Sequence, residues 1–87
     1  MFHYVYLLQS EKSQSLYIGY TKNLKRRLEE HNLGSNFSTK ADKPWKIIFY
    51  EAYASPDDAK RREKYLKTNQ GSRSLKRMIK EYLYCNQ

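Results

Sequence analysis

The alternation of apolar and polar positions predicts three β-strands in this chain. Residues 2–9 and 16–20 are rich in β-branched and aromatic side chains, and a polar stretch at 10–15 separates them. Two such runs joined by a polar turn are typical of a β-hairpin. Strand character returns at 45–53, so we expect a third strand there.

A first helix is predicted between the hairpin and the third strand. Thr21 or Asn23 can accept a hydrogen bond from the free amides at a helix start, and the helix then runs to about Leu33. Gly34 is placed to end it, because glycine readily adopts the left-handed conformation that follows many helices. Residues 35–44 follow as a polar loop.

Two more helices are predicted after the third strand. The segment 55–58 combines a serine cap, a proline and two acidic residues, which indicates a helix that reaches about Thr68 and is ended by Gly71. Ser72 then begins a third helix. Its apolar residues follow the spacing of one stripe and indicate a packing element; they are Leu75, Met78, Ile79, Tyr82 and Leu83.

The predicted order of elements is ββαβαα, which indicates an α+β fold. We expect a small three-stranded antiparallel sheet flanked by helices. A chain of 87 residues fits one domain, so residues 1–87 are assigned to a single domain.

The charge of the chain points to a polyanionic partner. Seventeen Lys and Arg residues against nine Asp and Glu give a formal net charge of +8, so nucleic acid is the expected partner. The nine tyrosines offer either stacking faces for bases or core packing. Cys85 is the single cysteine, and neither a signal peptide nor a membrane span is visible, so we expect a cytoplasmic protein with no membrane partner.

Two tyrosines of the hairpin are candidate site residues. If the turn centres on residues 11 and 12, Tyr6 lies opposite Tyr17 and Tyr4 opposite Gly19 on one face of the sheet. The other face is apolar and suits the core. Cross-strand tyrosine pairs also occur as plain packing, so the pairing alone leaves both interpretations open.

The first two helices place charged residues on faces that also carry apolar ones. On the first, Arg27 and His31 share a stripe with two leucines, either as site residues or as side chains reaching out from its edge. On the second, Glu63 lies among small and apolar neighbours. The basic run 60–64 could merely neutralise this carboxylate. Alternatively, its oxygens could bind Mg²⁺, which takes one or two carboxylates together with water and phosphate.

Together these residues resemble the GIY-YIG nuclease family, in its small single-domain bacterial form, over nearly the whole chain. Tyr4-Val5-Tyr6 stands for the GIY strand and Tyr17-Ile18-Gly19 for the YIG strand, so Tyr4 replaces the glycine and Val5 the isoleucine of the family name. The pattern continues through 21–24, Arg27, His31, 38–40, 44–45, Ala59, 62–63 and 66–67.

The resemblance implies a central three-stranded sheet and cleavage of DNA, in preference to RNA, with one divalent metal ion, Mg²⁺ or Mn²⁺. It implies these roles: Tyr6, Tyr17, Arg27 and His31 in catalysis, Glu63 on the metal, Lys40, Arg62 and Lys67 at the substrate, and Gly19 and Asn23 in the structure of the motif. We favour Tyr6 as the base that activates water, with Tyr17 orienting water or phosphate. An unperturbed phenol has a pKa of about 10, so we expect Arg27 and the metal to lower it.

Three functions follow as hypotheses. The first is a metal-dependent endonuclease or nickase of low sequence specificity, because no attached DNA-binding domain is visible. The second is a DNA- or RNA-binding module that keeps the nuclease fold without cleavage. The third is an adaptor that binds a partner through the stripe on the third helix, which requires that stripe to be exposed to solvent.

Overall fold

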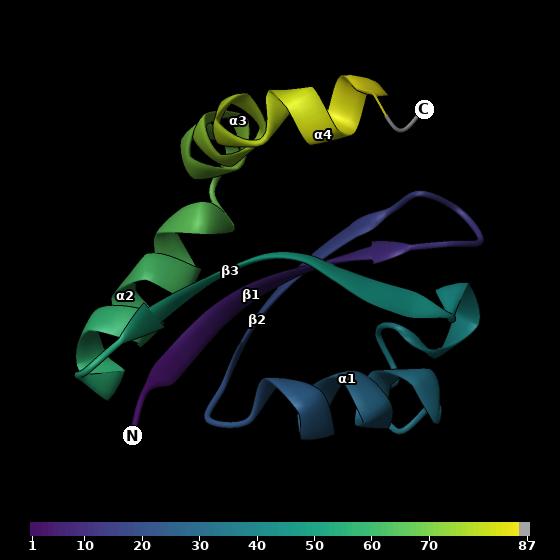
Figure 1. The fold of residues 1–87 in the computed structure, drawn as a ribbon, viewed down its shortest axis with the longest axis horizontal. Helices are drawn as coiled ribbons and strands as arrows, with labels where there is room; N and C mark the ends of the chain where they lie inside the picture. Colours follow the sequence, from purple (N-terminus) through teal and green to yellow (C-terminus); the bar gives the residue numbers. More distant parts are fainter. Residues whose placement is uncertain (86–87) are drawn as a thin grey trace.

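The computed structural model describes residues 1–85 and confirms the predicted α+β architecture. The elements follow the predicted order, with a short 3-10 helix before the third strand and a fourth helix at the end (Figure 1). Their bounds are β1 His3–Ser10, β2 Leu16–Thr21, α1 Leu24–Asn32, η1 Lys40–Asp42, β3 Trp45–Tyr53, α2 Pro56–Leu66, α3 Asn69–Met78 and α4 Lys80–Cys85. Within this part of the chain, no helix is long and apolar enough to cross a membrane.

The sheet has three strands in the order β2-β1-β3, and both pairs are antiparallel. The helix α1 covers one face, while α2 and α3 lie on the other (Figure 1). On the central strand β1, Val5 and Leu7 pack against α2 and α3, whereas Tyr6 and Leu8 pack with Trp45 on the α1 side. The alternation of side chains on β1 therefore divides the interior into two cores.

The register of the hairpin differs from the predicted one by two residues. Tyr6 pairs with Gly19, and Tyr17 pairs with Leu8, so the two tyrosines are not directly opposite each other. The predicted pairing of Tyr6 with Tyr17 is therefore wrong. Because side chains alternate along a strand with a period of two, this shift still leaves each residue on its predicted face.

The turn of the hairpin explains the shift. The Ser10 amide donates to the Ser15 carbonyl at 2.9 Å, so the turn spans residues 11–14 and centres on residues 12 and 13 rather than on 11 and 12. The Ser10 hydroxyl accepts hydrogen bonds from the amides of Lys12 and Ser13 at 3.0 and 2.9 Å. This side-chain acceptor stabilises a wider turn than the composition of the segment indicates.

The predicted start and end signals of α1 and the start of α2 are confirmed. The Asn23 side chain accepts a hydrogen bond from the Arg26 amide at 3.1 Å, and Gly34 follows α1 with a φ of +81°. At the start of α2, the Ser55 hydroxyl accepts a hydrogen bond from the Asp57 amide at 3.2 Å. Both caps satisfy amides that have no partner inside the helix.

The prediction that Gly71 ends the second helix and Ser72 begins the third is wrong. The hydroxyl of Thr68 accepts a hydrogen bond from the Gly71 amide at 3.0 Å, so Gly71 lies in the first turn of α3. A Cβ atom on Gly71 would collide with the Tyr65 carbonyl. Glycine is needed here because α3 approaches the end of α2 so closely.

The predicted third helix is divided into α3 and α4. The interruption lies at Ile79, where φ is −115° and ψ is 28°. Leu75 is buried, Ile79 packs against the same core, and Met78 is 54% exposed. The stripe therefore serves mainly as a packing element, and the adaptor hypothesis loses the exposed surface that it requires.

Candidate active site

Tyr6 lies on the central strand and is only 2% exposed. A Cβ atom on its partner Gly19 would collide with the hydroxyl and the ring of Tyr6. Gly19 therefore makes room for Tyr6, whereas the predicted register placed Gly19 opposite Tyr4. The Tyr4 ring instead packs edge-on against Tyr50, with ring centroids 5.9 Å apart.

The helix α1 brings two polar side chains to the Tyr6 hydroxyl. Arg27 Nε donates to the Tyr6 oxygen at 3.3 Å, and His31 Nε2 lies 2.9 Å from the same atom. Leu24 and Leu28 pack against the core beneath α1, which turns this face of the helix toward the sheet. The stripe recognised in the sequence therefore positions both polar residues.

A buried hydroxyl that the sequence did not single out as a site residue completes the cluster. Thr39 is fully buried, and its Oγ1 lies 2.7 Å from His31 Nδ1. Arg27 Nε can only donate, so the Tyr6 oxygen accepts that bond and its own proton can be donated to His31 Nε2 when that nitrogen is unprotonated. The imidazole then carries its own proton on Nδ1 and donates to Thr39, which makes one directed chain from arginine to threonine.

Burial dominates the electrostatics of this cluster. It raises the pKa of Tyr6 above its usual value, although the hydrogen bond and charge of Arg27 act in the opposite direction. It lowers the pKa of His31, and the charge of Arg27 lowers it further. Arg27 alone therefore does not bring about the expected lowering of the tyrosine pKa, and the cluster rests as a neutral phenol and a neutral imidazole beside a guanidinium.

Tyr17 joins the cluster through its ring. It packs against His31 with centroids 5.2 Å apart and against Trp45 at 6.4 Å, while the Tyr6 ring lies 5.9 Å from His31. The two tyrosines thus flank the same imidazole although they are not paired across the hairpin. Tyr17 is half-buried and lies on the edge strand β2, closer to solvent than Tyr6.

Glu63 of α2 approaches the cluster from the other side of the sheet. Its side chain is 22% exposed, and its carboxylate accepts from Lys67 Nζ at 3.1 Å. The negative charge of Glu63 contributes to the raised pKa of Tyr6, after burial, which is the largest cause. Burial and the hydrogen bond from Arg27 affect the pKa of Tyr6 more strongly than the charge of Glu63 does, so Glu63 acts on Tyr6 only weakly across the sheet.

Comparison with known proteins identifies the family to which this fold and this cluster of residues belong. The family model described as GIY-YIG catalytic domain matches residues 2–77. The chain belongs to the GIY-YIG family. This membership confirms the resemblance found in the sequence, and it assigns the chain a nuclease-type fold with nucleic acid as the expected class of substrate.

GIY-YIG relatives of similar length are found among bacterial UPF0213 proteins. One from Staphylococcus haemolyticus is 40% identical over 80 residues, covering 91% of this chain and 95% of the relative, and one from Staphylococcus aureus is 36% identical over the same shares. The solution NMR structure of a UPF0213 protein from Bacillus halodurans has a TM-score of 0.56 and 30% identity, covering 90% of this chain and 85% of that one.

The GIY-YIG family implies a divalent metal, and the candidate site of this chain offers one carboxylate, that of Glu63, as a ligand for it. Within residues 1–85, no group of three or more His, Cys, Asp and Glu side chains could hold a metal ion. Glu63 nevertheless offers hard oxygen atoms, and Mg²⁺ commonly binds through one or two carboxylates with water and substrate phosphate as its other ligands. The site therefore fits a metal that Glu63 holds as the single protein ligand.

The three predicted substrate-binding residues lie apart from one another. Lys67 neighbours the site through its ion pair with Glu63. Lys40 is exposed, with its amine 4.9 Å from the centroid of the Phe37 ring. Arg62 instead forms two hydrogen bonds with the Glu51 carboxylate of β3, at 3.0 and 3.1 Å. Only Lys67 is therefore joined to a proposed catalytic group.

Proposed function

We propose that this GIY-YIG protein is a single-domain, cytoplasmic, metal-dependent endonuclease or nickase that hydrolyses DNA phosphodiester bonds with low sequence specificity. The observation that carries the proposal is the Tyr6 oxygen, held at 3.3 Å by Arg27 Nε and at 2.9 Å from His31 Nε2. A hydroxyl fixed between a permanent cation and a neutral imidazole can lose its proton in one defined direction.

In the proposed reaction Tyr6 acts as the base. Its proton moves to His31 Nε2, which leaves a phenolate that still accepts the hydrogen bond from Arg27. The phenolate takes a proton from a water molecule as the water oxygen forms a bond to phosphorus and the bond from phosphorus to the leaving oxygen breaks. The leaving oxygen takes up a proton from solvent, and His31 afterwards releases its extra proton to solvent, so that both residues return to their resting state. The Nδ1–H of His31 donates to the Thr39 hydroxyl oxygen throughout, so the imidazole does not turn.

The resting pKa values show what the substrate complex has to supply. Tyrosine and histidine differ by about 3.5 pKa units in the unperturbed state, which corresponds to roughly 5 kcal/mol against the proton transfer. Burial widens this gap, because it raises the pKa of Tyr6 and lowers that of His31. A divalent cation on Glu63, when bound, supplies positive charge that favours the phenolate and stabilises the phosphate oxygens.

Tyr17 and Lys67 suit positioning roles. Tyr17 is half-buried beside His31 and is placed to orient the water or the phosphate. Lys67 forms an ion pair with the Glu63 carboxylate, and its amine would be free to meet a phosphate if that carboxylate held a metal. Arg62 and Lys40 stay predictions for more distant contacts with the substrate.

A plasmid nicking assay tests the proposal. Purified protein with Mg²⁺ or Mn²⁺ should convert supercoiled plasmid to the nicked form, while Arg27→Ala and Glu63→Gln should lower the rate by about 100-fold or more, because each removes charge stabilisation from the transition state. Arg26 and Glu29 are exposed on α1 and serve as controls of the same residue types, so Arg26→Ala and Glu29→Gln should retain the rate. Equal nicking by all variants would indicate a contaminant and refute the proposal.

The second candidate function is a DNA- or RNA-binding module without cleavage. Its support is the net charge of +8, which favours polyanion binding whatever the state of the catalytic cluster. Salt-dependent binding that survives Glu63→Gln, together with no cleavage under any divalent metal, would favour this function over the nuclease.

A further inference from the structure

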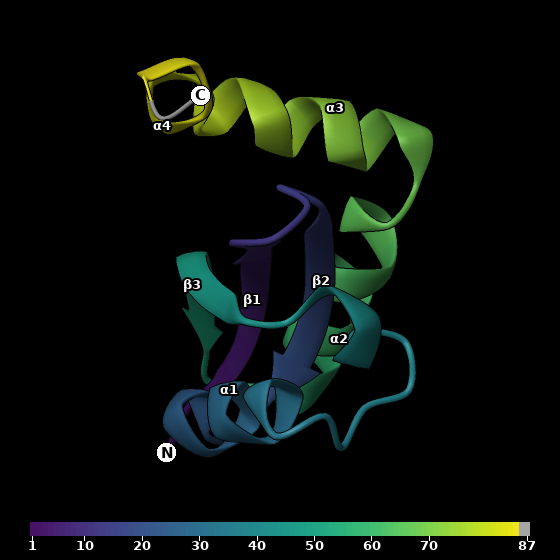
Figure 2. The same cartoon turned by 90° about the vertical axis from the view of Figure 1, so that its right-hand side faces the viewer.

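A cleft separates α3 from the end of the hairpin. Figure 2 shows α3 crossing the sheet beyond the turn that joins β1 and β2. The cleft has a volume of about 690 Å³, and it is lined by polar residues on the hairpin and on α3 above an apolar floor. The residues used below are Gln14, Ser15, Tyr17, Lys67, Ser72 and Lys76.

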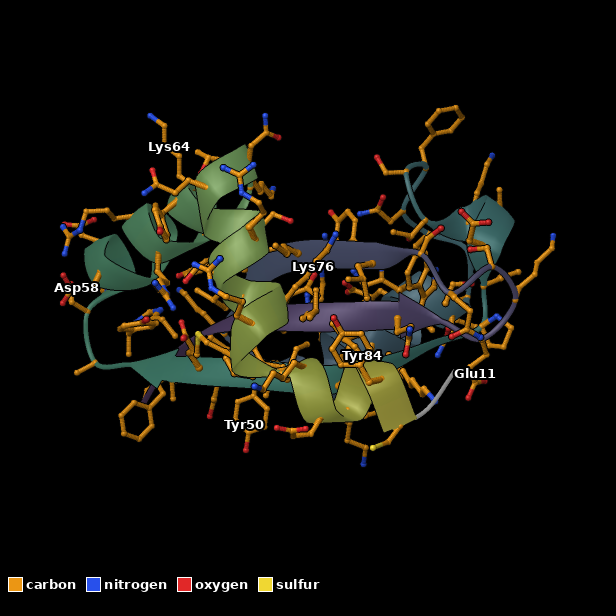
Figure 3. All side chains as sticks on the ribbon, turned by 90° about the horizontal axis from the view of Figure 1, so that it is seen from above. Glu11, Tyr50, Asp58, Lys64, Lys76 and Tyr84 are labelled. Carbon is orange, nitrogen blue, oxygen red and sulfur yellow. The ribbon has the colours of Figure 1, made fainter. Side chains whose placement is uncertain are left out.

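The α3 wall of this cleft is positively charged. Arg73, Lys76 and Arg77 lie on α3, which contains no acidic residue, and Lys76 is the one of the three that lines the cleft. None of the three forms an ion pair with another residue of the described chain, 1–85. Figure 3 shows Lys76 on the side of α3 that faces the hairpin turn, and Ser72 lies one helical turn before it. This wall therefore presents an uncompensated amine and a hydroxyl to an anion.

The cleft lies on the face of the sheet opposite the Tyr6 cluster and borders the proposed active site at the edge strand β2 and the end of α2. Tyr17 and Lys67 both line it, and Lys67 Nζ lies 3.1 Å from the carboxylate of Glu63. A chain of phosphates that follows the cleft from Lys76 to Lys67 therefore reaches the proposed metal ligand and the edge strand that carries Tyr17.

The volume of the cleft limits which form of nucleic acid can enter it. Pockets of about 300–1,000 Å³ enclose a ligand of drug size, which corresponds to one or two nucleotides, whereas a B-form duplex has a major groove alone about 12 Å wide. The positive wall meets the phosphates and the apolar floor meets the bases. We propose that the cleft between α3 and the hairpin holds a single strand of nucleic acid, so that the preferred substrates contain an unpaired strand beside the scissile bond. The cleavage part of this inference rests on the proposed nuclease function, whereas the binding part does not.

Binding measurements test the inference. Without metal, fluorescence anisotropy should show tighter binding of a labelled single strand than of a blunt duplex of equal length. Lys76→Ala should weaken single-strand binding and reduce the slope of log K against log salt by about 0.7, the loss of one phosphate contact. Lys25 is exposed on α1, on the opposite face of the sheet, so Lys25→Ala should change neither quantity in this way.

A protection experiment locates the strand. The exposed Cys85 is first replaced, and Ser72→Cys is then introduced in the Cys85→Ser background. Saturating single-stranded DNA should slow alkylation of the introduced thiol at least several-fold, and it should leave Lys25→Cys in the same background unaffected. Equal alkylation with and without DNA would overturn the proposal even if Lys76→Ala weakens binding, because the strand would then lie outside the cleft.

The outcomes separate this inference from the nuclease function. If the protein nicks DNA while Lys76→Ala binds single strands as wild type does, the strand path is wrong and the nuclease function stands. If no variant cleaves under any metal while Lys76→Ala loses single-strand binding and Ser72→Cys is protected, the nuclease function is wrong and the cleft stands as a strand-binding site.

Discussion

The Tyr6 hydroxyl couples the stability of the protein to its proposed chemistry. The hydroxyl accepts a hydrogen bond from Arg27 and lies within hydrogen-bond distance of His31. It fits beside Gly19 because a Cβ atom at that position would overlap with it. A buried polar group that loses its partner destabilises a protein more than an exposed one does. Residues of this cluster should therefore affect both the free energy of unfolding and the rate of cleavage, and to different extents.

Replacing each tyrosine separates these two effects. Tyr6→Phe leaves the buried His31 without its hydroxyl partner, so we expect a loss of about 1–3 kcal/mol in the free energy of unfolding and cleavage slower by about 100-fold or more. Within residues 1–85 the Tyr17 hydroxyl makes no hydrogen bond to the protein, so Tyr17→Phe should slow cleavage while changing stability little. Urea unfolding and plasmid nicking measure the two quantities. Equal stability of both variants would contradict the hydrogen-bond chain.

The buried imidazole should make stability depend on pH. Burial lowers the pKa of His31 in the folded protein, whereas an unfolded histidine titrates near 6.5. Between the folded pKa and about 6.5 the unfolded chain binds more protons, so the free energy of unfolding should fall as the pH drops below about 6.5 and should not depend on this group well above it. The lowered pKa of Glu30 acts in the same direction only at more acidic pH.

Urea unfolding of wild type and His31→Gln between about pH 5 and pH 8 checks this expectation. The variant should lack the part of the pH dependence that lies above about pH 5, because it has no imidazole at this position. An identical pH dependence in both proteins would show that His31 is not held neutral by burial.

At the scale of elements, the two faces of β1 separate the proposed chemistry from most of the packing. The Val5 and Leu7 face meets α2 and α3, while the Tyr6 face meets α1 and the loop that carries Thr39. The corner between α2 and α3 sets the position of α3, and thus the width of the proposed strand cleft. Its geometry depends on Gly71, which lies directly against the end of α2.

Gly71→Ala should disturb this corner. The added methyl group would collide with the Tyr65 carbonyl, a backbone atom that cannot rotate away. We expect a loss of about 1–3 kcal/mol in the free energy of unfolding, measured by urea denaturation. Gln70→Ala, an exposed change in the same helical turn, should alter stability by less than about 0.5 kcal/mol. Similar stability of the two variants would contradict the close approach.

At the scale of the whole molecule, the positive charge is largely free to meet a polyanion. The five ion pairs of the described residues use Arg26, Arg27, Arg61, Arg62 and Lys67, which leaves twelve of the seventeen basic side chains without an acidic partner. Such a surface binds nucleic acid mainly through counterion release.

Binding to duplex DNA should therefore weaken steeply with salt. The logarithm of the binding constant should fall linearly with the logarithm of the salt concentration, with a slope of about −0.9 for each phosphate contacted. Anisotropy titrations from about 50 to 200 mM NaCl measure this slope. An affinity that does not change over this range would show that the net charge does not drive binding.

The sequence determined the local elements and the faces of the sheet. Asn23 and Ser55 cap their helices as predicted, and Gly34 follows α1, because capping involves groups only a few residues apart. Arg27 and His31 lie on the predicted face of α1, since helical spacing alone places them on the side that carries the leucines.

Only the tertiary structure decided the contacts between distant residues. It set the register that puts Tyr6 on Gly19, it revealed Thr39 as the partner of His31, and it made Gly71 a contact residue rather than a helix end. These outcomes depend on atoms brought together by turns and helix packing, whereas periodicity and capping act within a single element. Sequence reasoning therefore found the candidate residues, while the direction of their hydrogen bonds and the buried state of Tyr6 followed from packing.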